Sequence, residues 1–167
     1  FNALGRNNIN IVAMNQGSSE TSITVVLEKK NIKKALNAIH ESFFLTEYQE
    51  LNIFVVGTGT VGGSLLEQLH SQKELIMNQN GVKLNVMGVA DVSKFILDRN
   101  GVDLTKYNEL LKTEGRESTP ESLKKALFEL NAFNCVFVDC TAAPAIAAMY
   151  LDLLQHNISV VCANKIA

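Results

Sequence analysis

From residue 51 onward, short apolar runs alternate with stretches whose apolar residues follow a helical spacing. The runs have the β-branched composition of buried parallel strands, and they predict strands over residues 51–56, 82–91, 135–141 and 158–163. We expect helices from residue 61 to the mid-70s, where residues 78–81 (NQNG) break the helix, within 104–112, over 120–130 and over 144–155. Thr119 is expected to cap the third helix, with Pro120 as its first residue. The alternation predicts an α/β fold, a parallel sheet with helices on both faces.

The first 46 residues follow a different pattern. Residues 1–8 resemble a helix end, and apolar runs at 9–14 and 21–27 predict an antiparallel hairpin joined by the polar turn 15–20. After Asn31, a candidate N-cap, one apolar helix face is predicted, formed by Ile32, Ala35, Leu36, Ile39 and Phe43. A polar junction, residues 45–50, follows. We therefore expect a partial α+β unit before the α/β domain.

Three glycines separate the first buried strand of the α/β domain from its helix. Gly57, Gly59 and Gly62 stand in the pattern G-x-G-x-x-G, which allows a sharp turn, close approach of a pyrophosphate and close packing of helix on strand. Free N–H groups along this turn, which includes Thr58, Thr60 and Val61, then face the phosphates. The pattern predicts a dinucleotide site. A plain strand–helix turn, or one that holds another nucleotide-shaped ligand, remains the alternative.

Asp91 ends the second buried strand, where a carboxylate can accept hydrogen bonds from the adenosine ribose of a dinucleotide. It stands farther from the glycines than the ~20 residues usual for that role. A carboxylate here repels the 2′-phosphate of NADP and favours NAD, whereas Lys94 and Arg99 nearby would have the opposite effect. A solvated loop carboxylate or a helix cap is the alternative.

The remaining strand ends carry Thr141 and Ala142, and then Asn164 and Lys165. Ligands of parallel sheets lie beyond the carboxyl ends of the strands. The small residues around Ala142 leave room for a flat ring or a ribose, and Thr141 offers a hydroxyl to a carboxamide or a ribose. Lys165 has the charge to meet a phosphate or a substrate carboxylate, or to donate a proton. An ordinary strand–helix corner and a solvated lysine are the alternatives.

The composition narrows the possible classes of protein. The 167 residues are 47% apolar and 19% charged with a net charge of −2, which suits a globular fold and offers no basic surface to nucleic acid or membrane. No apolar run approaches the ~20 residues of a membrane span, and no signal peptide is visible. Cys135, Cys140 and Cys162 lack metal-ligand spacing. They predict buried, reduced thiols in a cytoplasmic protein, with a metal site or a disulfide as the alternative.

Both ends of the chain indicate a piece of a longer protein. The chain begins with Phe1 rather than Met, inside an expected helix end. It closes on a buried strand with no helix after it to cover the sheet, which is an unusual end for a parallel strand. We therefore expect a fragment.

The two halves resemble two known domains. NINIVAMNQGSSETSITVVL with its following helix resembles the end of an aspartokinase ACT regulatory domain. IFVVGTGTVGGSLLEQL, GVAD, VDCTAAPA and VVCANK resemble the nucleotide-binding domain of homoserine dehydrogenase, which has a Rossmann-type fold. The order is that of bifunctional aspartokinase/homoserine dehydrogenases. The resemblance places the C-terminal part of an ACT-like, ferredoxin-like unit at residues 1–48 and a truncated NAD(P)-binding Rossmann domain at residues 49–167.

This resemblance implies reduction of aspartate 4-semialdehyde to homoserine with NADPH or NADH, on the route to threonine and methionine. It implies an aspartate kinase in the full-length chain, and a homo-oligomer, since ACT domains generally pair. By this resemblance, the three glycines match the family's phosphate loop and Thr141 matches a position near the nicotinamide. Asn164 and Lys165 match the motif at the boundary between cofactor and substrate. Gln16 falls in the turn near an amino-acid effector, commonly threonine. The main catalytic residues belong to a downstream domain, so the fragment alone is expected to be inactive.

Two other classes of protein fit parts of the same pattern. One is a regulatory module that senses a dinucleotide and an amino acid without chemistry of its own. The other is a methyltransferase, whose glycine loop is similar and which would bind S-adenosylmethionine. A catalytic domain beyond Ala167 in the parent gene separates the enzyme from the regulatory module.

Overall fold

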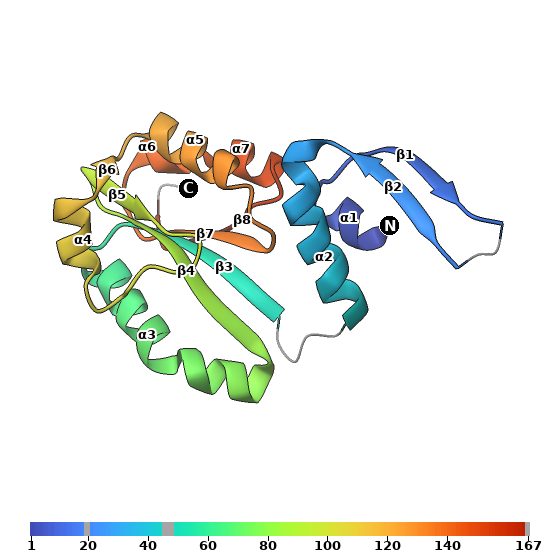
Figure 1. Cartoon of the computed structure of the whole chain (residues 1–167). Coiled ribbons are helices and arrows are strands. Elements are labelled where there is room, and N and C mark those ends of the chain that lie inside the picture. Colours follow the sequence, from blue (N-terminus) through green and yellow to red (C-terminus); the bar gives the residue numbers. More distant parts are fainter. Residues whose placement is uncertain (19–20, 45–48, 166–167) are drawn as a thin grey trace. The chain divides into compact units, whose positions relative to one another are not determined.

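The computed structural model describes residues 1–18, 21–44 and 49–165, without the side chains of Glu41 and Phe44. The chain divides into two compact units, Phe1–Thr46 and Glu47–Ala167 (Figure 1). Two expected segments lie partly outside the described residues. They are the polar turn 15–20, at residues 19–20, and the polar junction 45–50, at residues 45–48, where the expected domain boundary falls.

The first unit contains a hairpin and two helices. Its elements are α1 (Asn2–Arg6), β1 (Ile11–Gln16), β2 (Ile23–Leu27), the 3₁₀ turn η1 (Lys29–Asn31) and α2 (Ile32–Phe44). β1 and β2 pair antiparallel, which confirms the predicted hairpin. One detail was wrong, because β1 extends to Gln16, which is therefore a strand residue instead of a turn residue. Asn31 ends η1 and directly precedes α2, and its role as the N-cap of that helix stays a prediction.

The buried side of α2 differs from the predicted apolar face. Ala35 and Ala38 are buried, at 3% exposure each, whereas Ile32, Leu36 and Phe43 remain exposed. Ala35 belongs to the small core of the unit with Leu4 and Ile9. Two strands present only a narrow surface to a helix, so small residues make the close contact and the larger side chains stay outside it.

The second unit is built on a six-stranded sheet in the order β6-β5-β4-β3-β7-β8. Its strands are β3 (Gln49–Val56), β4 (Val82–Ala90), β5 (Lys94–Leu97), β6 (Arg116–Glu117), β7 (Cys135–Asp139) and β8 (Ser159–Cys162). β4, β3, β7 and β8 run parallel, which confirms the four predicted strands. β5 and β6 pair antiparallel at one edge and were not predicted.

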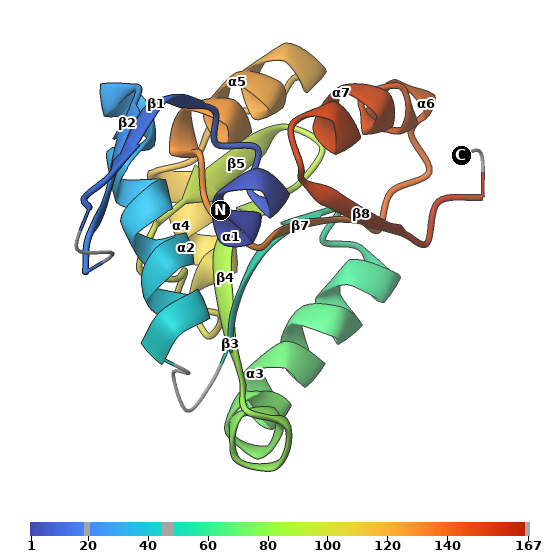
Figure 2. The ribbon, with the colours of Figure 1, turned by 90° about the vertical axis from the view of Figure 1, so that its right-hand side faces the viewer.

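Helices cover both faces of this sheet, as expected for the α/β fold (Figure 2). They are α3 (Thr60–Asn80), α4 (Tyr107–Thr113), α5 (Pro120–Leu130), α6 (Pro144–Ala147) and α7 (Tyr150–Gln155). Alternate residues of β3 point to opposite faces. Phe54 and Val56 join the core under α5, α6 and α7, whereas Ile53 and Val55 join the core under α3 and α4.

Three helix ends test the sequence signals. Thr119 caps α5 through the Ser122 N–H, with Pro120 first in the helix, which confirms that prediction. The expected end of α3 in the mid-70s was too early, but the break does fall within residues 78–81. The helix continues to Asn80 and ends where Gly81 adopts φ 64° and donates its N–H to the Met77 carbonyl. The single helix expected over residues 144–155 is split into α6 and α7.

The expectations for membrane spans, metal ligands and cysteines can also be compared with the described residues. No helix among them is long and apolar enough to cross a membrane. No group of three or more His, Cys, Asp or Glu in this part of the chain is placed to hold a metal ion. Cys135 is buried, Cys140 is half-buried and Cys162 is exposed, and all three are in the thiol form. The expectation of three buried thiols was therefore wrong for Cys162, whose strand β8 lies at the sheet edge.

Two neighbouring leucines of α7 provide a test of this packing. Leu153 is fully buried, whereas Leu154 is 54% exposed. We expect Leu153→Ala to lower the free energy of unfolding by about 2–5 kcal/mol, because it leaves a cavity in the core. Leu154→Ala should change it by less than about 0.5 kcal/mol. Chemical denaturation of both variants measures the difference, and equal losses would contradict the assigned face of α7.

Candidate functional site

The sheet changes direction at β3. The chain passes from β3 to β4 on one side and returns to β7 on the other, which makes a topological switch point, the place where open α/β sheets bind ligands. Because β3, β4, β7 and β8 are parallel, their carboxyl ends meet at one edge of the sheet. The residues predicted to bind a cofactor follow these four strands and are therefore brought to that edge.

Gly57 forms the turn after β3 and is held from both sides. Its N–H donates to the Ala90 carbonyl at 2.8 Å, and the Cys140 N–H donates to the Val56 carbonyl at 2.8 Å. Gly57 has φ 95°, and a Cβ here would lie 2.9 Å from backbone atoms of Cys140. Both the backbone conformation and the lack of space therefore require glycine.

Gly62 lies in the first turn of α3 and packs directly on the glycine turn. A Cβ on Gly62 would stand 1.7 Å from the carbonyl oxygen of Gly57, far inside contact distance. Gly62 is buried as well. The absence of a side chain at this position is what allows α3 to begin immediately beside the end of β3.

Gly59 faces open space. It is the N-cap of α3, and a Cβ built on it would have no described atom within 4 Å. Thr60 and Val61, the first two residues of α3, are exposed, and Thr58 is half-buried. The first turn of α3, all of it described, carries no acidic residue. This helix start therefore presents backbone N–H groups to a clear space where an anion can approach.

Asp91 lies directly after β4, half-buried beside the glycine turn. Its Oδ1 accepts hydrogen bonds from the Ser93 N–H at 2.7 Å, the Ser93 hydroxyl at 2.9 Å and the Lys94 N–H at 2.6 Å. Burial alone would raise the pKa of Asp91, but these hydrogen bonds outweigh it and lower the pKa below its ordinary value. Asp91 is thus a fixed, ionised carboxylate that also shapes the turn into β5.

The two cations near Asp91 in sequence are bound to backbone carbonyls. The Lys94 ammonium donates to the carbonyl of Lys112 at 2.8 Å, and the Arg99 guanidinium donates to the carbonyl of Leu130. These contacts hold both side chains within the second unit itself. The positive charge of Lys94 still helps to lower the pKa of the Asp91 carboxyl.

Asp139, the last residue of β7, is the residue that sequence reasoning missed. Its side chain is fully buried. It accepts hydrogen bonds from the Thr141 N–H at 2.7 Å, the Tyr150 hydroxyl at 2.6 Å and the Asn164 amide at 3.1 Å. The available signal was an aspartate closing the apolar run CVFVD, because a carboxylate there must find donors.

The other predicted site residues are placed as follows. Thr141 is half-buried, Ala142 and Lys165 are exposed, and Asn164 is buried at 6% exposure. The Asn164 amide also donates to the Ala143 carbonyl at 3.2 Å. Asn164 is thus committed to contacts inside the protein, whereas Lys165 is accessible. Gln16 belongs to the first unit, at the exposed end of β1.

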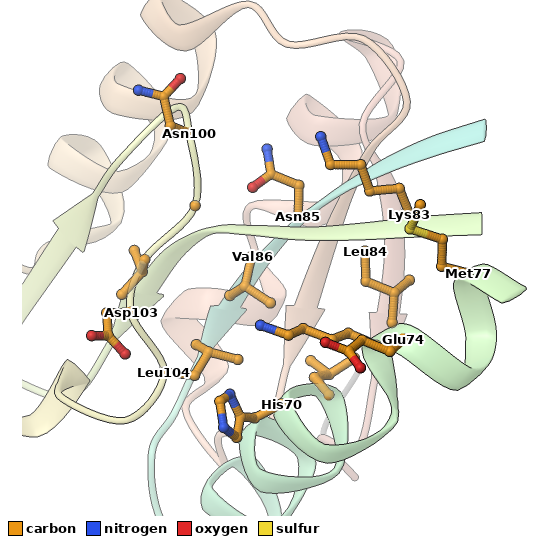
Figure 3. Close-up of a pocket in the computed structure, with 14 residues that line it drawn as sticks. His70, Glu74, Met77, Lys83, Leu84, Asn85, Val86, Asn100, Asp103 and Leu104 are labelled. Carbon is orange, nitrogen blue, oxygen red and sulfur yellow. The ribbon is translucent and has the colours of Figure 1, made fainter. Parts of the chain in front are cut away.

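A cavity of about 470 Å³ lies away from these strand ends (Figure 3). It is lined by the middle of α3, the first half of β4 and the segment after β5, including His70, Lys73, Val86 and Leu104. None of the predicted cofactor-binding residues lines it. The cavity is therefore separate from the edge of the sheet that carries the glycine turn.

A parallel sheet whose switch point carries a G-x-G-x-x-G turn defines a dinucleotide-binding α/β domain. Residues 57–167 match the family model "Homoserine dehydrogenase, NAD binding domain", and the chain belongs to this family. Residues 1–43 match the model of the ACT domain. The resemblance inferred from the sequence is confirmed.

Known proteins carry both parts in one chain. The protein is 39% identical over 167 residues to bifunctional aspartokinase/homoserine dehydrogenase 1 of Arabidopsis thaliana, covering 99% of this chain and 18% of that protein. It is 36% identical over 165 residues to the bifunctional enzyme of Haemophilus influenzae, covering 99% and 20%. The chain thus spans about a fifth of the length of these relatives.

Solved structures agree with this assignment. A hyperthermophilic archaeal homoserine dehydrogenase mutant in complex with NADPH has a TM-score of 0.56 and 26% identity, over 71% of this chain and 37% of that one. The homoserine dehydrogenase of Thermoplasma acidophilum has a TM-score of 0.54 and 25% identity, over 70% and 36%.

Gly62 and Gly63 offer a matched test of the turn. We expect Gly62→Ala to lower the free energy of unfolding by about 1–3 kcal/mol, because its Cβ overlaps the Gly57 carbonyl oxygen and α3 must shift. Gly63→Ala meets only ordinary contacts, the nearest at 3.6 Å, and should stabilise the helix by about 0.4–1 kcal/mol. Urea denaturation compares them. Tolerance of alanine at Gly62 would contradict the close packing.

Proposed function

We propose that the chain is the cofactor-binding part of a homoserine dehydrogenase, within a bifunctional aspartokinase/homoserine dehydrogenase. The observation that carries the proposal is the open helix start at Gly59, at the switch point of a sheet that belongs to this family. The order of an ACT domain before the NAD-binding domain supports the bifunctional layout. The reaction is reduction of aspartate 4-semialdehyde, a small molecule, to homoserine with NADPH or NADH.

The roles of the site residues follow from their positions at the sheet edge. The N–H groups of Gly59, Thr60 and Val61 bind the pyrophosphate, because unpaired N–H groups and the helix dipole both favour negative charge. Asp91 lies on the β4 side, where the adenosine ribose is expected. When bound, the reduced cofactor supplies the hydride that converts the aldehyde to an alcohol.

The nicotinamide half belongs on the other side of the switch point, beside β7 and β8. Thr141 offers a hydroxyl there, and the small, exposed Ala142 leaves room for a flat ring. Asn164 holds the backbone that carries Lys165, the accessible cation at the cofactor–substrate boundary. The residues that bind the substrate and the kinase site are expected in other parts of the whole protein, so this chain alone binds cofactor without turnover.

Further properties of the whole protein are part of the same proposal. We infer an amino-acid effector, such as threonine, near Gln16 of the ACT unit, and a homo-oligomer formed through ACT domains. Three cysteines in the thiol form support a reducing compartment, the cytoplasm, although the plant relatives are named as chloroplastic. A regulatory module that senses a dinucleotide remains the second candidate, favoured by the ACT match. Assay of the whole protein with aspartate 4-semialdehyde separates the two.

Gly59→Val tests the pyrophosphate site. We expect calorimetry to show at least about tenfold weaker binding of NADPH and NADH, a loss of about 1.4 kcal/mol, because the side chain fills the space for the phosphates. The fold should tolerate it, since no described atom lies near that Cβ. Gly59→Ala is the graded control with a smaller loss. Unchanged affinity in a folded Gly59→Val protein would refute the site.

Asp91→Asn tests the choice between the two cofactors. The amide oxygen keeps accepting the Ser93 and Lys94 N–H groups, so the turn survives, but the negative charge is removed. One charge pair in water is worth about 1 kcal/mol at contact, so we expect affinity for NADPH relative to NADH to rise about fivefold. The gain should shrink at high salt. A ratio that stays constant in titrations of both cofactors would remove Asp91 from the ribose site.

A further inference from the structure

Asp139 joins three separate segments at the carboxyl ends of β7 and β8. Its Oδ1 accepts the Thr141 N–H, from the loop after β7. Its Oδ2 accepts the Tyr150 hydroxyl of α7, at 2.6 Å, and the amide of Asn164, which follows β8. A carboxylate with no exposed surface is tolerated only with such partners. Loss of any one of them would therefore disturb the positions of the others.

Tyr150 is a donor in this cluster at neutral pH. Burial raises the pKa of its phenol, and the hydrogen bond and charge of Asp139 raise it further. The hydroxyl therefore keeps its proton and donates it in the hydrogen bond to the Asp139 carboxylate. Tyr150 is half-buried, and its ring packs against the core under α5, α6 and α7.

The loop of residues 141–143 is held at several points by the same cluster. Asp139 binds the Thr141 N–H, and the Asn164 amide binds the Ala143 carbonyl at 3.2 Å. The Thr141 hydroxyl oxygen accepts the Ala143 N–H at 3.1 Å. An oxygen that already accepts this bond keeps its own proton for a further acceptor. The cluster thus presents Thr141 as a hydrogen-bond donor.

This donor stands beside the glycine turn on the β7 side. The Thr141 methyl carbon would lie 3.0 Å from a Cβ on Gly57. A dinucleotide that crosses the switch point, with its ribose side at β4, puts its nicotinamide half on the β7 side. The hydrogen bonds that Asp139 accepts come from Thr141, Tyr150 and Asn164, and not from Gly59, Thr60 or Val61, which face the pyrophosphate space. Its influence on a bound cofactor is therefore confined to one half.

We propose that Asp139 and Tyr150 are positioning residues that fix Thr141 as the donor to the nicotinamide half of the cofactor. The proposal rests on the proposed function, because it assumes that the site binds a nicotinamide dinucleotide. The cluster fixes the loop before the cofactor arrives, so binding does not have to order it. The pair thereby gives the site its preference for a dinucleotide with nicotinamide over one without it.

The test compares two pairs of ligands on the whole 167-residue chain. NADH is compared with ADP-ribose, and NADPH with 2′-phospho-ADP-ribose, since each second ligand keeps the pyrophosphate and the adenosine but lacks the nicotinamide. We expect Tyr150→Phe to weaken the binding of NADH and NADPH at least fivefold. The binding of ADP-ribose and 2′-phospho-ADP-ribose should change by less than twofold. Gly59→Val should weaken all four. A role in stability alone would weaken the members of each pair equally.

Two further variants keep the test decisive if Tyr150→Phe folds poorly. Thr141→Val removes the hydroxyl and leaves the Asp139 carboxylate unchanged, so it should weaken the binding of NADH and NADPH selectively. Thr141→Ser keeps the hydroxyl and should retain that binding. Equal losses for both members of a pair, or no loss, in Tyr150→Phe and Thr141→Val would overturn the proposed positioning. If the unaltered chain binds none of the four ligands, the proposed function fails, and the positioning role fails with it.

Discussion

The second unit depends on one close contact, between the Gly57 carbonyl oxygen and the Cα of Gly62, where even a methyl group would stand 1.7 Å from that oxygen. This contact lets α3 start immediately after β3 and directs its free N–H groups over the sheet edge. The same turn is tied to β4 through the Ala90 carbonyl and lies against the backbone of Cys140 after β7. The close packing of Gly57 on Gly62 thus fixes the ends of β3, β4 and β7 relative to one another.

The two sides of the switch point are fixed by different physical means. On the glycine side, backbone packing and a positive φ exclude side chains at Gly57 and Gly62, and Gly59 leaves the peptide groups of the turn open to a ligand. On the β7 side, a buried carboxylate collects donors from three segments. The close backbone packing tolerates almost no side chain at the glycine positions. The polar cluster is instead destabilised when a single hydrogen-bond donor is lost. The site therefore combines two separate sources of rigidity.

The sequence predicted those parts whose signals are local. Four parallel strands, the glycine turn and the Thr119 cap each depend on residues close together in the chain. β5 and β6 were missed because they are four and two residues long and are defined by pairing with β4 and with each other. The Asp139–Tyr150 bond was missed for the same reason, since only the fold brings α7 to the end of β7. The apolar face predicted for α2 is buried only in part, at Ala35 and Ile39, because a two-stranded sheet covers little of it.

The two sides of the switch point also differ in the charge that they present. Asp91, whose pKa is lowered by hydrogen bonds from its own turn, puts a fixed negative charge at the end of β4. At the ends of β7 and β8 the carboxylate of Asp139 is buried and fully engaged, so the surface there offers the Thr141 hydroxyl and the Lys165 ammonium instead. The hydrogen bonds of Asp91 come from Ser93 and Lys94, whereas those of Asp139 come from Thr141, Tyr150 and Asn164. The proposed choice of cofactor and the proposed placement of the nicotinamide therefore depend on different groups.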